Sequence, residues 1–290
     1  MMQTEKEFLS DYAPIDVEAV VGSELNHAAK YKSHPKPIAV LLAGQPGAGK
    51  TVLSAMLNKL LHDDVYFING DEYRRFHPNY RKLFDTYGSD SVQMTSKFSG
   101  EVTERLIQQI ADRKVNLIIE GTGRTTEIPH KTAKALTEKG YRVELAVIAT
   151  RPEQSLCSTL LRFYEMNEGG TIPRATAAEA HDHIVNVLPE NLDTLYNDSM
   201  ISKITIWDRT PEKVYDSEMD YESPSEALQE YWFRPWSDEE YQHITQIVDL
   251  LRGKEAQYHL GQSAAIDELE RRVQSISSNL EHSFDNLSLS

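Results

Sequence analysis

Residues 37–51 read Pro-Ile-Ala-Val-Leu-Leu-Ala-Gly-Gln-Pro-Gly-Ala-Gly-Lys-Thr, and this stretch decides the fold. The apolar run Ile38–Ala43 leads into Gly44–Thr51, which matches the phosphate-loop pattern G-x-x-x-x-G-K-[ST]. A chance glycine-rich turn is the alternative, since about one protein in a hundred of this length would match by chance. The context favours a phosphate loop, because a buried strand is predicted before it and an amphipathic helix after it.

The residue types of this loop suit a bound nucleoside triphosphate. Glycines let successive backbone N–H groups turn toward a phosphate, and the positive end of the following helix points to the same place. Lys50 has the charge to neutralise the β- and γ-phosphates, and the Thr51 hydroxyl is a ligand for Mg²⁺. The residues expected to bind the nucleotide are Gly44, Gln45, Pro46, Gly47, Ala48, Gly49, Lys50 and Thr51.

Apolar runs and helical patterns alternate after this loop. The predicted strands cover 38–43, 65–68, 116–119, 143–149 and 204–207, and the predicted helices cover 50–62, 91–113, 130–139, 152–166 and 176–196. Strands that are apolar throughout and alternate with helices are typical of a parallel sheet covered on both faces. The sequence therefore predicts a three-layer α/β fold with a mostly parallel, five-stranded sheet.

The two ends of the chain differ from this central part. Residues 1–36 are predicted to be a helical N-terminal leader, with one amphipathic helix over residues 15–29, and a Pro-containing break before the first strand. The core is expected to span residues 37–220, and residues 221–290 are expected to form a helical C-terminal extension.

Two serines, Ser223 and Ser237, are predicted to begin helices in the extension, and Gly253 to end the second of them. The last predicted helix carries apolar residues three and four apart from Ile266 to Leu280. This stripe is short for a coiled-coil seam, which favours docking on the rest of the domain.

The composition excludes several classes of protein. A net charge of -15 argues against a nucleic-acid partner or an anionic membrane surface. The single cysteine, Cys157, allows no internal disulfide and fits a reducing cytoplasm. No run reaches the ~18 apolar residues of a membrane-spanning helix. None of the 10 histidines has partners at metal-ligand spacing, and His181 and His183 are expected on a helix face.

Polar residues follow two of the predicted strands. In open parallel sheets, ligands bind beyond the carboxyl ends of the strands. Asp71 follows the second strand, and Glu120, Thr122 and Arg124 follow the third. The topology therefore brings these four residues to the same edge as Lys50.

Asp71 is the candidate general base. A carboxylate in line with the γ-phosphate accepts the proton of an acceptor hydroxyl, while positioning and electrostatics supply the rest of the catalysis. The alternative is a turn-forming or helix-capping Asp after Gly70. The neighbouring phosphate loop favours the role of base.

For the other charged candidates, the sequence allows both a functional and a structural or surface role. Glu120 suits Mg²⁺ or substrate hydroxyls, and a purely structural role is disfavoured by the cost of an unpaired charge at a buried strand end. Arg124 suits a bidentate grip on an anionic substrate, or is a solvated surface residue. Glu104, taken alone, is typical of a solvated helix face. Arg162 and Arg174 frame a polar, glycine-containing segment that suits a closing lid, or an ordinary helix–helix loop.

Five motifs together resemble the zeta-toxin family, in particular its Pez-type branch, which comprises toxins of bacterial toxin–antitoxin pairs. They are Leu42–Thr51, Gly70–Asp71, Ile119–Thr126, Thr159–Arg162 and Arg174–Thr176. The chain has no N-K-x-D guanine signature, which also favours a small-molecule kinase. The resemblance implies a P-loop kinase that uses ATP and Mg²⁺ to phosphorylate the 3′-hydroxyl of UDP-N-acetylglucosamine, which blocks peptidoglycan synthesis.

The resemblance also implies roles for individual residues. Lys50 matches the phosphate-binding lysine and Asp71 the catalytic base, while Arg162 and Arg174 match the pair that contacts the ATP phosphates. The positions that bind the nucleotide sugar are matched by Glu104, Glu120, Thr122, Arg124 and Thr132. Arg209 falls where such kinases place residues beside adenine.

Two departures from the family pattern stand out. Asn69 replaces a frequently acidic residue, which bears on metal hydration, and the segment before Arg174 is richer in glycine. The resemblance further implies a bacterial, cytoplasmic protein with a separate antitoxin. Two alternatives stay open, namely a phosphate-loop kinase for another hydroxyl, on an amino sugar or an antibiotic, and an ATP-dependent regulatory or binding module.

Overall fold

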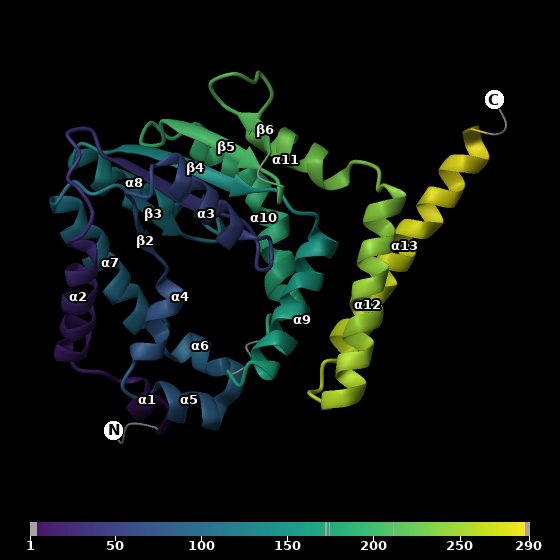
Figure 1. Ribbon diagram of the computed structural model, residues 1–290, viewed down its shortest axis with the longest axis horizontal. Helices are drawn as coiled ribbons and strands as arrows, with labels where there is room; N and C mark the ends of the chain where they lie inside the picture. The colour runs from purple at the N-terminus through teal and green to yellow at the C-terminus, as the bar shows by residue number, and fades with distance from the viewer. Residues whose placement is uncertain (1–4, 172, 174, 211, 288–290) are drawn as a thin grey trace.

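The computed structural model describes residues 5–287 except 172, 174 and 211, and its centre is one six-stranded sheet (Figure 1). The strands are β1 (Ile38–Ala43), β2 (Tyr66–Ile68), β3 (Leu117–Glu120), β4 (Arg142–Ile148), β5 (Lys203–Trp207) and β6 (Lys213–Asp216). Their order is β2-β3-β1-β4-β5-β6, and only β5 and β6 pair antiparallel. The predicted α/β fold with a mostly parallel sheet is confirmed, with one strand more than expected.

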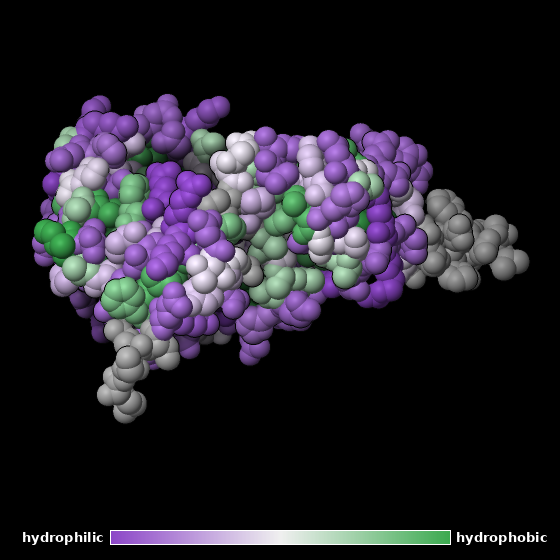
Figure 2. Space-filling model, turned by 90° about the horizontal axis from the view of Figure 1, so that it is seen from below, coloured by the Kyte–Doolittle hydropathy of each residue, from purple (hydrophilic) through white to green (hydrophobic). Residues whose placement is uncertain are grey.

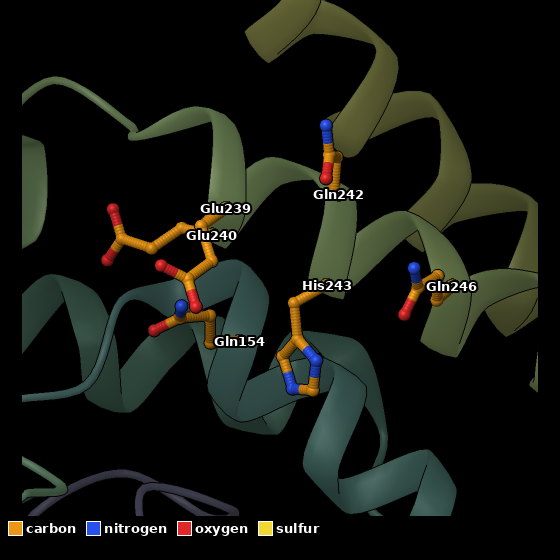
Figure 3. Close-up of a pocket in the computed structure, with 6 residues that line it drawn as sticks. All are labelled: Gln154, Glu239, Glu240, Gln242, His243 and Gln246. Carbon is orange, nitrogen blue, oxygen red and sulfur yellow. The ribbon is translucent and has the colours of Figure 1, made fainter.

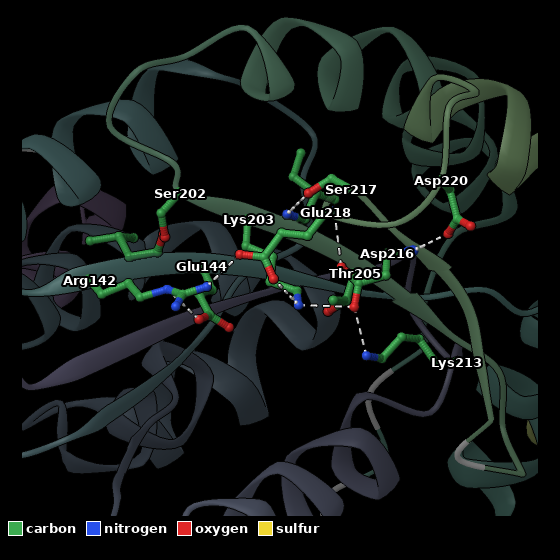
Figure 4. A network of polar contacts seen from close by, with 12 residues as sticks. Arg142, Glu144, Ser202, Lys203, Thr205, Lys213, Asp216, Ser217, Glu218 and Asp220 are labelled. Carbon is green, nitrogen blue, oxygen red and sulfur yellow. Dashed lines mark hydrogen bonds and ion pairs between the residues drawn. The ribbon is translucent and has the colours of Figure 1, made fainter.

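The additional strand, β6, lies at the edge of the sheet and is held by ion pairs (Figure 4). Lys203 Nζ lies 2.9 Å from the Asp216 carboxylate and 2.7 Å from that of Glu218, and Lys213 Nζ lies 2.7 Å from Asp216. Arg142 on β4 extends the network to Glu218. Short polar strands of this kind give no apolar run, so the sequence pattern missed β6.

The sheet is flanked by helices on both sides. They are α1 (Glu5–Ser10), α2 (Pro14–Ala28), α3 (Lys50–Leu60), α4 (Gly70–Tyr73), α5 (Tyr80–Tyr87), α6 (Ser91–Met94), α7 (Ser96–Asp112), α8 (Glu127–Glu138), α9 (Pro152–Glu168), α10 (Ala178–Tyr196), α11 (Pro224–Phe233), α12 (Asp238–Tyr258) and α13 (Ser263–Leu287), with 3₁₀ turns at Arg74–Phe76 and Gly88–Asp90. The long predicted helices are confirmed, although the one expected over 91–113 is interrupted at Thr95.

Two buried clusters cover the two faces of the sheet. Alternate residues of β1, such as Val40 and Leu42, pack on α3 through Leu53. The intervening residues, such as Leu41, belong to a larger cluster that includes side chains of α2, α7, α8, α10 and α11. Side chains of a strand alternate between faces, so an apolar strand needs cover on both sides. The predicted three-layer arrangement follows from this.

The C-terminal helices begin where the sequence predicted. Ser223 and Ser237 accept hydrogen bonds from the backbone N–H of the third residue of α11 and of α12, and both sites are capping boxes. The prediction that Gly253 ends α12 is wrong, because the helix continues to Tyr258. One glycine costs a helix only about 1 kcal/mol, and contacts beyond it, such as Tyr164 Oη donating to Glu255 at 2.7 Å, hold the last turn.

Helices α12 and α13 lie side by side at one end of the molecule (Figure 1). Ile266, Leu269 and Val273 of α13 are buried with residues of α9 and α12, including Leu160 and Ile244. The apolar stripe of the last helix therefore docks on the rest of the protein, as expected for the described side chains. The side chain of Leu280 lies beyond those that the structure describes.

The surface mixes polar and apolar residues. On the face seen in Figure 2, hydrophilic residues are spread over the whole area between smaller hydrophobic groups. Within the described part of the chain, no helix is both long enough and apolar enough to cross a membrane.

Candidate active site

The phosphate loop joins the end of β1 to the start of α3 and passes very close to α9. Gly47 has φ 75°, and a Cβ built on it would lie 2.0 Å from the carbonyl oxygen of Ser155. No side chain fits there, and the positive φ also favours glycine. Gly47 stands at a position that the phosphate-loop pattern leaves open, and glycine there is a steric requirement of the loop's contact with α9.

The loop is held from the carboxyl ends of two strands. Gln45 is fully buried, and its Nε2 donates to the carbonyl of Thr150, just after β4, at 2.7 Å. The Thr150 hydroxyl in turn donates to the Ala48 carbonyl at 2.6 Å. Arg209, just after β5, donates through Nε to the same carbonyl at 3.2 Å and through Nη2 to Gly47 O. Arg209 therefore braces the loop directly.

Lys50 and Glu120 form a charged pair whose side chains are only 10% and 20% exposed. Lys50 Nζ lies 4.0 Å from Glu120 Oε1 and donates to the carbonyl of Gly44 at 2.8 Å. Burial lowers the pKa of Lys50, which the carboxylates of Glu120 and Asp71 oppose. Burial also raises the pKa of Glu120 above its ordinary value, against the opposing charge of Lys50. The charge of each group therefore favours the charged form of the other, against the desolvation that both experience.

Strand register brings the ends of β2 and β3 together. Ile68 pairs with Ile119, so Asn69 lies beside Glu120 one residue further on. Asn69 Nδ2 donates to Glu120 Oε2 at 3.1 Å, and its Oδ1 accepts from the backbone N–H of Asp71 at 3.0 Å. Asn69 is therefore a direct link between two candidate site residues. The sequence had flagged this position only as a departure from the family pattern.

Asp71 lies in the first turn of α4 and remains accessible. Its side chain is 65% exposed, and its Oδ1 accepts a hydrogen bond from Arg74 Nε at 2.8 Å. Arg74 is fixed in turn by donating to the Val92 carbonyl at 2.6 Å. Sequence reasoning missed Arg74, although its spacing of three from Asp71 on a helix was a usable signal.

The segment after β3 runs alongside the phosphate loop. The backbone N–H of Gly44 donates to the carbonyl of Thr122 at 3.3 Å. A Cβ on Gly123, which has φ 74°, would lie 2.5 Å from a methyl of Leu188 on α10, so this turn also requires glycine. Arg124 follows it as an exposed residue.

The remaining described candidates lie on helices α7, α8 and α9. Glu104 on α7 is exposed and pairs with Lys131 on α8 at 2.7 Å, and Thr132 follows as a half-buried residue of α8. Arg162 is exposed on α9 but lies close enough to act electrostatically on both Lys50 and Glu120. Arg174 lies outside the described residues. The structure therefore brings Lys50, Glu120, Asp71 and Arg162 into one electrostatic cluster.

Two depressions lie on the helices. One of about 450 Å³ begins at Thr51 and runs along α3 past Val52 and Met56. The other, of about 510 Å³, lies between α9 and α12 and is lined by Gln154, Glu239, Glu240, Gln242, His243 and Gln246 (Figure 3). It contains none of the predicted site residues. Among the described residues, no three His, Cys, Asp or Glu side chains are grouped to hold a metal.

Comparison with known proteins identifies the family. The model of the family described as "Zeta toxin" matches residues 22–220, which is more than half of the chain. The chain belongs to the zeta toxin family. This match spans both the phosphate loop and the segment after β3.

Individual members of the zeta toxin family are also similar to this chain. It is 40% identical to Toxin PezT of Streptococcus pneumoniae over 80% of its own length and 92% of that protein. It is 37% identical to Toxin zeta of Streptococcus pyogenes, over 75% and 77% of the two chains. Among solved structures, one from the characterisation of the PezAT chromosomal toxin–antitoxin system of S. pneumoniae superimposes with a TM-score of 0.76 at 36% identity. It covers 84% of this chain and 99% of that one.

Proposed function

We propose that this protein is an ATP-dependent kinase that phosphorylates the 3′-hydroxyl of UDP-N-acetylglucosamine and acts as a toxin that an antitoxin neutralises. One observation carries the proposal. The ends of β1, β2 and β3 bring Lys50, Asp71 and Glu120 into one cluster, with Asn69 bonded to Glu120. A phosphate loop next to an accessible carboxylate is what transfer to a hydroxyl requires, since the donor and the base must share one site.

Lys50 has the role of binding the donor. Its ammonium lies at the N-terminal end of α3, where backbone N–H groups and the helix dipole also attract phosphate. A γ-phosphate between Lys50 and Arg162 meets positive charge from two sides. That charge stabilises the oxygens of the transferring group most strongly in the transition state.

Asp71 has the role of the base. As the bond between the γ-phosphorus and the β,γ-bridging oxygen breaks, a new bond forms to the 3′-oxygen of the acceptor, whose proton passes to an Asp71 carboxylate oxygen. ADP leaves with the electron pair of the broken bond. Arg74, at 2.8 Å, fixes the orientation of the Asp71 carboxylate, which is exposed enough to meet an incoming sugar.

Mg²⁺ fits the donor set of this site. Mg²⁺ in kinases is held by one or two protein oxygens together with the nucleotide phosphates and water, so a full cage of protein ligands is not needed. The Thr51 hydroxyl at the start of α3 and the Glu120 carboxylate would hold it, and Asn69 orients that carboxylate. Bound there, the ion would neutralise charge on the triphosphate.

A toxin role and a protein antitoxin are supported by relatives. Proteins similar to this chain include Toxin PezT and Toxin zeta, and a similar solved structure comes from the characterisation of a toxin–antitoxin system. We infer a bacterial, cytoplasmic protein that an antitoxin binds. Co-expression with an affinity-tagged antitoxin from the same operon tests this. The expected result is a purified complex and restored growth, and unimpaired growth without the antitoxin would contradict a toxin role.

The catalytic part of the proposal is tested with mass spectrometry. Purified protein, ATP and UDP-N-acetylglucosamine should give a nucleotide sugar heavier by one phosphate. A panel with other amino-sugar nucleotides and antibiotic hydroxyls shows whether another acceptor is preferred. Transfer to one of those compounds alone would contradict the assigned substrate and keep the kinase.

The Asp71→Asn variant tests the base. The amide keeps the shape but does not accept the proton, so turnover should fall by about 10²–10⁴-fold while the Kd for ATP stays within about twofold. Asp85→Asn, an exposed Asp of α5, is the matched control and should keep full turnover. Undiminished transfer by Asp71→Asn would remove Asp71 from the role of base.

A further inference from the structure

A chain of hydrogen bonds leads from the phosphate loop into α9 and α10. Gln45 Nε2 lies 3.1 Å from Ser155 Oγ on α9. Ser155 Oγ lies 2.7 Å from His181 Nε2 on α10, and His181 Nδ1 lies 3.0 Å from Asp182 Oδ1. Gln45, Ser155 and His181 are all 0% exposed, so water does not compete for the Gln45–Ser155 and Ser155–His181 bonds. His181 was expected on a helix face, and it lies on the buried face of α10.

The chain continues to the C-terminal helix. Arg272 of α13 grips the Asp182 carboxylate with two hydrogen bonds, Nη1 to Oδ1 at 2.9 Å and Nη2 to Oδ2 at 2.6 Å. Its Nε donates to Glu268 at 2.8 Å, which fixes the plane of the guanidinium. Bidentate pairs of this kind are strong and directional. The contacts thus link α13 to the nucleotide loop through a chain of five side chains, from Arg272 to Gln45.

The donors and acceptors of this relay follow one consistent order. Since Gln45 Nε2 donates to the Thr150 carbonyl, its amide orientation is fixed and its second N–H points to Ser155 Oγ. The Asp182 carboxylate only accepts, so His181 Nδ1 carries a proton and donates to it. In a neutral imidazole Nε2 is then an acceptor for the Ser155 hydroxyl at 2.7 Å, and the Pro152 carbonyl at 2.9 Å is a second acceptor for the same hydrogen. Burial lowers the pKa of His181, against the opposing carboxylate of Asp182, which favours this neutral form.

Ser155, His181 and Asp182 have the connectivity of a nucleophilic triad, but burial excludes that role. A nucleophile must reach a substrate, whereas Ser155 and His181 have no exposed surface. The hydroxyl faces the Gln45 amide instead. The role of Ser155 is therefore to hold the phosphate loop through Gln45.

The loop depends on this support. Gln45 Oε1 is buried and has no hydrogen-bond partner among the described residues, so the two N–H bonds of its amide alone fix its side chain. A loop whose binding-competent conformation is only partly populated binds its ligand more weakly in proportion to that population. Loss of the Ser155 bond therefore weakens nucleotide binding without removing a single contact to the nucleotide.

We propose that His181 and Arg272 are positioning residues of the nucleotide site, through which the docked C-terminal helix α13 holds the phosphate loop in its ATP-binding conformation. The relay runs Arg272–Asp182–His181–Ser155–Gln45. It gives α13 a function beyond burying apolar surface, because undocking this helix would release the loop. The proposal rests on the proposed function only in taking Gly44–Thr51 as the ATP site.

The test compares two arginine variants by calorimetric titration with ATP and, separately, with UDP-N-acetylglucosamine. Arg272→Met breaks the relay. Arg252→Met, the control, breaks ion pairs from α12 to Asp267 and Glu270 of α13 but leaves the relay intact. Arg272→Met should raise the Kd for ATP about tenfold, or about 1.4 kcal/mol, and leave that for the nucleotide sugar within about twofold. Equal Kd values for ATP in both variants would overturn the proposal.

Two histidine variants guard against a general loss of folding. His181→Gln keeps an acceptor near the position of Nε2 and should restore most of the ATP affinity that His181→Ala loses. NMR of the imidazole nitrogens in the unmodified protein should show a neutral ring protonated at Nδ1. ATP affinity unchanged in His181→Ala, or a ring protonated only at Nε2, would contradict the relay. These readouts use ATP binding, so a failure to phosphorylate UDP-N-acetylglucosamine leaves them intact.

Discussion

At the scale of single residues, Gly47 allows the sharpest test of the loop geometry. A Cβ at this position would lie 2.0 Å from the Ser155 carbonyl oxygen, and φ is 75°. Gly47→Ala must therefore shift backbone against backbone, which moves the N–H groups of the loop off the phosphates. We expect ATP binding to weaken by about 100-fold or more, measured by titration, with the far-UV circular dichroism unchanged.

Gly22→Ala is the control for this substitution. Gly22 lies within helix α2, has no atom within 4 Å of a built Cβ, and has no positive φ. Alanine is the better helix former, so the free energy of unfolding should rise by about 0.5–1 kcal/mol and ATP binding should not change. Normal ATP binding by Gly47→Ala would mean that the loop is not held against α9 as described.

The residue types of the site were predictable, but their partners were not. Lys50, Asp71 and Glu120 followed from a short motif and from the rule that ligands bind at the strand ends. These three residues cluster because each follows a strand whose carboxyl end lies at the same edge of the sheet, and the sequence shows which residues follow the strands. The hydrogen bond between His181 and Ser155 joins residues 26 apart in the sequence, and the one from Arg209 to Gly47 joins residues 162 apart. A local sequence pattern does not contain information on contacts at such separations.

At the scale of elements, strand β6 carries a pH-dependent part of the stability. Burial alone would raise the pKa of Asp216, but hydrogen bonds from Lys213 and Lys203 outweigh it and hold the pKa at about 2, against an ordinary 3.8. A carboxyl group whose pKa is lower in the folded than in the unfolded protein contributes its full stabilisation at pH values above the unfolded-state pKa. That contribution is lost as the pH falls from about 4 to about 2.

Asp216→Asn should remove this contribution. At pH 7 the free energy of unfolding should fall by about 1–3 kcal/mol, because two lysines lose a buried acceptor. The difference between variant and unmodified protein, measured by urea unfolding, should stay constant down to about pH 5 and shrink below pH 4. Glu218→Gln, on an exposed carboxylate of the same network, should have a smaller effect. A difference that grows on acidification would contradict the ion-pair account.

The elements that the sequence predicted are those with a strong hydrophobic period. β1 and α3 were placed to within two residues, because apolar runs and capping residues mark them. β6 and the short helices α4 and α5 were missed, since polar residues dominate them and distant contacts decide their conformation. The end of α12 was placed wrongly at Gly253, because tertiary packing outweighs one unfavourable residue in a helix.

At the scale of the whole molecule, α13 is expected to contribute to stability through its buried stripe. Leu269 has no exposed surface and packs with residues of α9 and α12. Leu269→Ala should lower the free energy of unfolding by about 2–5 kcal/mol, measured by urea unfolding. Leu250→Ala on the neighbouring helix α12, where Leu250 is 48% exposed, should cost less than about 1 kcal/mol. Equal costs would mean that α13 is not docked in solution.

We propose that the phosphate loop and the carboxylate at Asp71 form the donor and acceptor halves of one kinase site. The most direct measurement is ³¹P NMR of the protein incubated with ATP, Mg²⁺ and UDP-N-acetylglucosamine. We expect a new phosphomonoester signal coupled to the sugar proton at carbon 3, with one ADP formed for each product. ADP and inorganic phosphate without any phosphomonoester would contradict it.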